Sequence, residues 1–195
     1  VGRVVELLPA ATIKPERTEY VWDGRIVAGD LNPLVGPPGV GKGATMMHVS
    51  ARPTPGDLDG DLKGTPAAVI ISSAEDSPAH AIVPRLLAAG ADMDLVFIVR
   101  VTVDDAEDGL TLPDDVPSLA ALVKDKGAAL VIVDPLAAHL SGKVDSHKDA
   151  SIRRALAPLA RMAHETGAAV LAVAHTNKAA GSDWVRRVGG SVGLG

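Results

Sequence analysis

The sequence predicts an α/β fold in which a mostly parallel sheet lies between two layers of helices, and three observations lead to this expectation. Short apolar segments alternate along the chain with segments of helical character, which is the pattern of consecutive βαβ units. The composition is 47% hydrophobic but only 2% aromatic, so Ala, Val, Leu and Ile must fill the core, as in parallel sheets buried on both faces. A length of 195 residues allows one such domain with a sizeable core.

The predicted strands are short, mostly apolar segments bounded by turn or polar residues. In chain order they cover residues 31–35, 67–72, 96–101, 128–133 and 168–174. Pro33 is unfavourable in the first of them because it has no N–H to donate. The glycine-rich segment that follows still supports a strand there.

The predicted helices cover residues 44–51, 78–89, 118–126 (with Ser118 as its cap) and 151–166, and the segments 52–65, 104–116 and 137–149 are predicted loops. Residues 1–30 form an N-terminal lead-in segment. Within it, Tyr20 and Trp22 either pack on the domain edge or line an adenine pocket. Residues 31–195 form the predicted core, which we expect to be truncated at its C-terminus.

Charge and composition exclude several classes of protein. A formal net charge of −5 excludes a strongly basic nucleic-acid-binding surface, although not a local basic patch. Cys is absent, so disulfides and Cys-based zinc sites are excluded. The N-terminal residues do not have a signal-peptide pattern, and the apolar segments are shorter than the ~20 residues of a membrane span. We therefore expect a soluble, cytoplasmic protein.

The chain contains a glycine loop of the form G-x-x-x-x-G-K, from Gly36 to Lys42. Backbone N–H groups of such a loop cradle phosphates, and the helix that follows adds the positive end of its dipole. Lys42 is expected to reach the β- and γ-phosphates of ATP. The predicted nucleotide-binding residues are Gly36, Pro37, Pro38, Gly39, Val40, Gly41, Lys42, Gly43 and Ala44.

The loop departs from the usual pattern at Gly43. A Ser or Thr normally follows the lysine and places its hydroxyl on Mg²⁺. Thr45 lies two positions further along the predicted helix, roughly 200° around it, and cannot simply take over this role.

Polar residues follow three other predicted strands. Asp134 ends the apolar segment 130–133 and is a candidate Mg²⁺ ligand. Glu75, in preference to Asp76, is a candidate to polarise the attacking water, with a helix N-terminal carboxylate as the alternative. His175 is a candidate γ-phosphate contact, with a surface or capping residue as the alternative. Because ligands bind at the carboxyl ends of parallel strands, we expect these side chains and the glycine loop to share one site.

With these motifs, the chain resembles the RecA-like P-loop ATPases and, within them, the RepA-like group of replicative-helicase-type AAA ATPases. The similar stretches cover most of residues 20–194 and include GPPGVGKG, SSAEDS, PRLLAAGAD, LVIVDPLAAHL, VDSHKDA, RRALAPLARMAHETGAAVLAVAHTNK and RVGGSVG. The resemblance implies a three-layer P-loop NTPase core with strand order 3-2-4-5-1. It also implies that Glu75 activates water, Asp134 holds Mg²⁺ and His175 senses the γ-phosphate.

The resemblance further implies a homo-oligomeric ring, often a hexamer, that translocates on single-stranded DNA. Arg187, with Arg186 as the fallback, resembles the arginine finger that reaches a neighbouring subunit. Basic residues in the loops after the fourth and fifth strands are candidates to contact DNA: Lys143, His147, Lys148 and Lys178. Metal binding by Asp145, His147 and Asp149 is less favoured than a solvated loop.

Three functions remain open at this point. The first is an ATPase that drives DNA translocation or replication. The second is a degenerate subunit that binds nucleotide but barely hydrolyses it, because Gly43 replaces the Mg²⁺-binding hydroxyl. The third, a small-molecule P-loop kinase, fits Glu75 and His175 least well.

Overall fold

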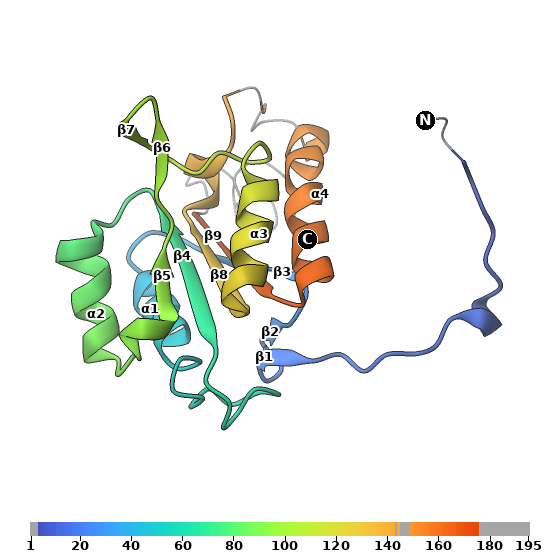
Figure 1. The fold of residues 1–195 in the computed structure, drawn as a ribbon, viewed down its shortest axis with the longest axis horizontal. Coiled ribbons are helices and arrows are strands. Elements are labelled where there is room, and N and C mark those ends of the chain that lie inside the picture. The colour runs from blue at the N-terminus through green and yellow to red at the C-terminus, as the bar shows by residue number, and fades with distance from the viewer. Residues whose placement is uncertain (1–3, 143, 145–148, 176–195) are drawn as a thin grey trace.

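The centre of the fold is a five-stranded parallel sheet (Figure 1). The computed structural model describes residues 4–142, 144 and 149–175. In spatial order the strands are β3 (Leu31–Gly36), β9 (Ala169–His175), β8 (Ala128–Asp134), β4 (Ala68–Ser73) and β5 (Val96–Ile98), and neighbouring strands are parallel throughout. Counted along the chain and taken from the β5 edge, this order is 3-2-4-5-1. The predicted fold class and strand order are confirmed.

Helices cover both faces of the sheet (Figure 1). On one face lie α1 (Lys42–Ala51) and α2 (Val83–Ala88), and on the other lie α3 (Val116–Lys126) and α4 (Asp149–Thr166). The central strands alternate between the two layers. In β4, for example, Val69 and Ile71 pack with residues of α1 and α2, whereas Ile70 packs with residues of α3 and α4. Two apolar cores therefore sandwich the sheet, as the Ala/Val/Ile/Leu composition predicts.

A small hairpin of β1 (Tyr20–Trp22) and β2 (Ile26–Val27) leads into the sheet. The chain from residue 4 through the 3₁₀ turn η1 (Ala10–Thr12) extends away from the domain (Figure 1). Trp22 packs against the apolar core on the α1 side, with the Arg25 guanidinium 4.6 Å from its ring centroid. This position favours packing over the alternative that Trp22 lines an adenine pocket.

The Asn32-Pro33 pair fits the position of β3 at the sheet edge. The buried Asn32 side chain accepts a hydrogen bond from the Val27 amide at 2.8 Å and donates to the carbonyls of Val27 and Asp30 at 3.0 and 2.9 Å. These bonds join the β1–β2 hairpin to the sheet. Pro33 is exposed, and an edge strand tolerates proline because one of its sides has no neighbouring strand.

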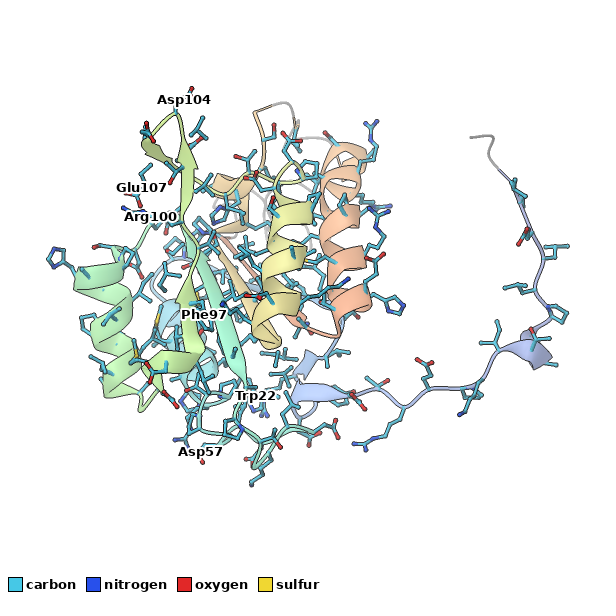
Figure 2. The ribbon with its side chains drawn as sticks, viewed as in Figure 1. Trp22, Asp57, Phe97, Arg100, Asp104 and Glu107 are labelled. Carbon is cyan, nitrogen blue, oxygen red and sulfur yellow. The ribbon has the colours of Figure 1, made fainter. Side chains whose placement is uncertain are left out.

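The third predicted strand was too long. β5 ends at Ile98, and β6 (Val101–Val103) forms a separate antiparallel hairpin with β7 (Ala106–Asp108). β6 begins at the last residue of the predicted strand, and β7 lies in the predicted loop 104–116. Asp104 and Asp105 both have positive φ, 48° and 64°. Positive φ at both central residues is the geometry of a type I′ hairpin turn, and Asp tolerates it better than most residues. Figure 2 shows Asp104 at the tip of this protruding hairpin, with Glu107 and Arg100 nearer its base.

The helix boundaries also differ from the prediction. α1 begins at Lys42 rather than 44, α3 at Val116 rather than 118, and α4 at Asp149 rather than 151. Pro117 occupies the first turn of α3, where a missing N–H costs nothing. The segment predicted as one helix over 78–89 starts with a π-helical turn, η2 (Pro78–Ile82), before α2 begins. Short 3₁₀ turns also form where no helix was predicted, at η3 (Met93–Leu95) and at η4 (Leu136–His139), most of which lies in the predicted loop 137–149.

Candidate active site

One cavity of about 770 Å³ lies at the carboxyl ends of the sheet strands. It brings together four residues that the sequence places after different strands, namely Lys42, Glu75, Asp134 and His175. The complete lining is Gly39, Gly41, Lys42, Gly43, Ala44, Met47, His48, Glu75, Asp76, Arg85, Ala88, Ala89, Asp134, Val173 and His175. The common site expected from the topology of a parallel sheet is therefore present.

The glycine loop has a backbone that ordinary residues would strain. Gly39 and Gly41 have φ of 81° and 91°, and a Cβ added at either would meet no other atom within 4 Å. These glycines are therefore needed for their conformation rather than for lack of space. Gly39 and Gly41 line the cavity, whereas Gly36 and the intervening residues of the loop do not.

The amino terminus of α1 faces the cavity. Lys42 is its first residue, and its first hydrogen bond of helical spacing runs from the Thr45 amide to the Gly41 carbonyl at 2.9 Å. The N–H groups before Thr45 therefore have no i−4 carbonyl within the helix to bond. Such a terminus attracts anions through these donors and through the helix dipole.

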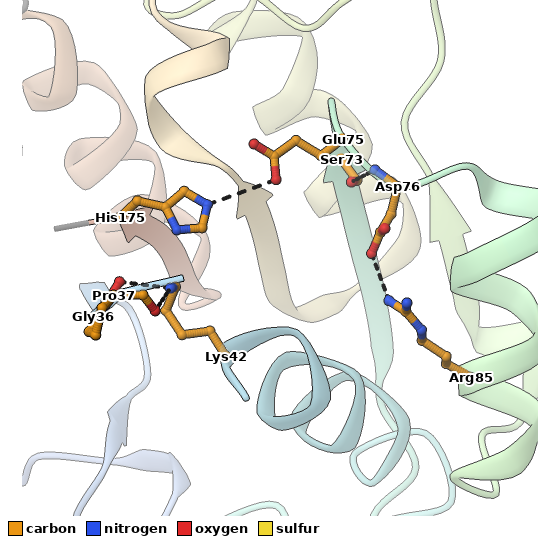
Figure 3. Close-up of polar contacts among 8 residues, drawn as sticks. All are labelled: Gly36, Pro37, Lys42, Ser73, Glu75, Asp76, Arg85 and His175. Atoms are coloured by element: carbon orange, nitrogen blue, oxygen red, sulfur yellow. Dashed lines mark hydrogen bonds and ion pairs between the residues drawn. The ribbon is translucent and has the colours of Figure 1, made fainter. Parts of the chain in front are cut away.

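The Lys42 side chain lies across the loop. Its Nζ donates hydrogen bonds to the carbonyl of Gly36 at 2.7 Å and to that of Pro37 at 2.9 Å, as Figure 3 shows. The residue is only 8% exposed, so these two bonds satisfy a largely buried ammonium. To contact a phosphate, Nζ must exchange at least one carbonyl for a phosphate oxygen.

Gly43 lines the cavity next to Lys42, and Thr45 is absent from the lining. A Cβ at position 43 would have no other atom within 4 Å. A serine would therefore fit there without displacing a neighbour.

Asp134 is the buried carboxylate of the site. It ends β8 opposite Ser73 of β4, and its carbonyl accepts a hydrogen bond from the Ala74 amide at 2.9 Å. Burial raises the pKa of the Asp134 carboxyl above its usual range, and the carboxylates of Glu75 and Asp76 raise this pKa further. His175 and His139 act in the opposite direction. The site thus concentrates negative charge around Asp134.

Glu75 and Asp76 are adjacent in sequence but point to different partners (Figure 3). The Glu75 Oε2 atom lies 3.8 Å from Nε2 of His175, a distance that makes an ion pair only when the histidine is protonated. The Asp76 Oδ2 atom lies 2.8 Å from a terminal guanidinium nitrogen of Arg85 on α2. Only Glu75 of the two is therefore paired across the cavity with a predicted site residue.

The sequence prediction missed the wall of the cavity formed by α1 and α2. This wall consists of Met47, His48, Arg85, Ala88 and Ala89. Periodicity places these residues on helices, but the packing of the two helices against each other decides which side chains reach the cavity. The charge of Arg85, on the helix that follows Glu75 and Asp76, was a sequence signal that this residue could face the site.

Several predicted residues lie outside the part of the chain that the structure describes: Lys143, Asp145, His147, Lys148, Lys178, Arg186 and Arg187. Asp149 begins α4, but its side chain is not described. Within residues 4–142, 144 and 149–175, no group of three or more His, Asp or Glu side chains is arranged to hold a metal. In the same residues, no helix is long and apolar enough to span a membrane.

Comparison with known families agrees with the site. The profile of a family described as "AAA domain" matches residues 6–181. The chain belongs to this AAA-domain family. It is therefore an ATPase-type, nucleotide-binding domain of the P-loop class, from a family in which nucleotide usually binds with Mg²⁺ and oligomers are common. No curated protein matches the chain.

The lining of this cavity in the AAA domain fits a nucleoside triphosphate. Positive φ at two loop glycines, the free amino terminus of α1 and the Lys42 ammonium all favour phosphate oxygens at one end of the cavity. The Asp134 carboxylate could supply one ligand to a divalent cation whose other ligands would be phosphate oxygens and water. Asp134 is buried, and Glu75 and Asp76 raise its pKa, so a cation at this carboxylate would offset their repulsion.

The raised pKa of Asp134 predicts that this residue lowers the stability of the nucleotide-free domain. A carboxyl whose pKa is higher in the folded chain than in the unfolded chain makes folding less favourable once it ionises. The loss begins as pH rises past the usual Asp value of about 4 and is complete above the raised pKa. Asp134→Asn should therefore melt at a higher temperature than the wild type at pH 7, and the difference should shrink as pH falls toward 4.

The measurement is thermal unfolding followed by circular dichroism across this pH range, with the exposed Asp114→Asn as the control. Saturating Mg²⁺ and ATP should reverse the order, because only the wild type retains the carboxylate for the cation. A wild type more stable than Asp134→Asn at pH 7 without ligand would contradict this account of the buried carboxylate.

Proposed function

We propose that this AAA domain is a RecA-like ATPase of the RepA-like helicase type, which couples ATP hydrolysis to DNA translocation or replication. The observation that carries the proposal is the convergence of Lys42, Glu75, Asp134 and His175 on one cavity, each from the end of a different strand. A nucleotide-binding loop alone would need only the first of these residues.

Each residue has a role that follows from its chemistry and place. Lys42 and the amides at the start of α1 bind the phosphates and offset their charge. Glu75 is 59% exposed in its side chain, so it can accept a proton from a water beside the γ-phosphate. His175 would sense whether the γ-phosphate is present, and its position 3.8 Å from Glu75 supports this role. Asp134 would hold Mg²⁺, which when bound neutralises charge on the β- and γ-phosphates.

The proposed coupling to DNA rests on the resemblance of the chain to RepA-like helicases. In a ring of identical subunits, Arg187 would enter the site of a neighbour and stabilise charge on the γ-phosphate. The lysines at 143, 148 and 178 would provide local positive charge for single-stranded DNA on an otherwise acidic chain.

A second candidate function is nucleotide binding with little hydrolysis. Gly43 favours it, because the hydroxyl that usually contributes one Mg²⁺ ligand is missing and Thr45 does not reach the cavity. The intact Lys42, Glu75 and Asp134 favour an active ATPase. The two candidates differ in the turnover of the wild-type protein.

Replacement of Glu75 tests the hydrolytic proposal. Glu75→Gln should still bind ATP, since the loop and Lys42 are unchanged, but should turn over at least ~10²-fold more slowly because the general base is lost. The assay is steady-state phosphate release, with and without single-stranded DNA, alongside ATP binding by calorimetry. Glu107→Gln, an exposed glutamate on the β6–β7 hairpin, is the matched control and should behave as the wild type. The proposal fails if the wild type binds ATP but releases no phosphate, or if Asp76→Asn slows turnover more than Glu75→Gln does.

Restoring the hydroxyl after Lys42 tests the second candidate. Gly43→Ser should bind Mg²⁺ together with ATP more tightly and hydrolyse ATP faster than the wild type. The open space at position 43 and the better helix propensity of Ser, by a few tenths of a kcal/mol, should preserve stability. Gly43→Ala is the matched control, because it adds the Cβ without the hydroxyl. The readout is ATPase rate against Mg²⁺ concentration. Brisk wild-type turnover at low Mg²⁺, with no gain in Gly43→Ser, would rule out the degenerate subunit.

A further inference from the structure

The loop between β4 and α2 carries Glu75, but the contacts that fix this loop are made by the residues on either side of Glu75. The Ala74 amide donates to the Asp134 carbonyl at 2.9 Å, and the Asp76 amide donates to the Ser73 hydroxyl at 3.1 Å. The Asp76 carboxylate then pairs with Arg85 at 2.8 Å. These contacts bracket Glu75 on both sides. The Glu75 side chain is more exposed than that of Asp76, at 59% against 31%.

The backbone at Arg85 is anchored by buried neighbours on either side. Ile82 ends the π-helical turn η2, Leu86 follows Arg85 directly, and both are fully buried against the sheet. Asp76 precedes η2 in the sequence and Arg85 follows it, so their ion pair links the two ends of the segment that contains this turn. π-Helical turns recur at functional sites, and here the turn lies between the two partners of the ion pair.

The directions of the side chains separate the roles of the two acids (Figure 3). Glu75 points toward His175, on the side of Lys42 and the glycine loop, whereas Asp76 points toward α2. The Asp76 Oδ2 atom that pairs with Arg85 is occupied by this contact. Arg85 lines the same cavity, and its guanidinium pairs with Asp76.

We propose that Arg85 is a positioning residue, which holds Glu75 in its catalytic orientation through the carboxylate of Asp76. The idea rests on the proposed ATPase function and extends it, because it assigns a task to Asp76 that is not proton transfer. A general base must lie within hydrogen-bond reach of its water, and a displacement of about 1 Å can cost up to ~10²-fold in rate. The ion pair is partly exposed, so its contribution to global stability should be small.

The test compares Arg85→Ala, Arg85→Lys, Asp76→Asn and the double variant Arg85→Ala/Asp76→Asn in the full chain. Arg85→Ala should lower kcat by about 10-fold to 10²-fold with the ATP dissociation constant unchanged. Arg85→Lys should recover part of the rate, because a lysine can keep a single charged contact to Asp76. The double variant should be no slower than either single variant, since all three break the same pair. Arg100→Ala, which breaks the exposed Arg100–Glu107 pair on the β6–β7 hairpin, is the matched control and should keep wild-type kcat.

A second readout does not depend on hydrolysis. Backbone amides 74–77 should exchange hydrogen for deuterium faster in Arg85→Ala and Asp76→Asn than in the wild type or Arg100→Ala, all without nucleotide. If the wild type binds ATP but does not hydrolyse it, the ATPase proposal fails, while faster exchange still supports the positioning role. Unchanged exchange at 74–77 overturns the positioning role whatever the turnover. A loss of ATP affinity at unchanged kcat in Arg85→Ala also overturns it, because Arg85 would then bind nucleotide directly.

Discussion

The parallel register of the central strands is the constraint on which the site depends. The pairing of β4 with β8 sets Ser73 opposite Asp134, and the pairing of β3 with β9 sets Gly36 opposite His175. The carboxyl ends of parallel strands lie at the same edge of the sheet. This register therefore brings the glycine loop, Asp134 and His175 together with the loop that carries Glu75. A shift of register by one residue would also turn every inward-facing side chain of a strand to the opposite layer. The packing of the two apolar cores therefore fixes the geometry of the site.

This arrangement places two charged side chains, Lys42 and Asp134, in buried positions, where burial disfavours their charged forms. Asp134 is buried beside two other carboxylates, and the buried Lys42 ammonium bonds to two loop carbonyls. Neither charge is needed to hold the sheet, whose strands are joined by backbone hydrogen bonds and apolar packing. Ligands of the opposite sign would balance both charges, phosphate for the lysine and a divalent cation for the aspartate. The site thus resembles other functional sites in which local stability is given up for binding.

Much of the fold could be predicted from the sequence because the signals were local. Segments such as 68–72 and 128–133 are short, apolar and rich in Val and Ile, which favours buried strands, and Gly36 to Lys42 needs a strand before it and a helix after it. Other features depend on conformations or contacts that residue type indicates only weakly. The β6–β7 hairpin requires positive φ at Asp104 and Asp105, and Val101 continued the apolar pattern of β5. The pairing of Asp76 with Arg85 depends on how η2 turns the chain into α2, which no periodicity encodes.

The central claim is that the glycine loop of this AAA domain binds a nucleoside triphosphate through Lys42. Its most direct test is calorimetric titration of Mg²⁺ and ATP into the wild type and Lys42→Ala, with Lys124→Ala, an exposed lysine on α3, as the control. Loss of a charged hydrogen bond to phosphate should weaken binding by about tenfold or more, with unchanged circular dichroism and unchanged affinity in the control. Equal ATP affinity in the wild type and Lys42→Ala would contradict the account.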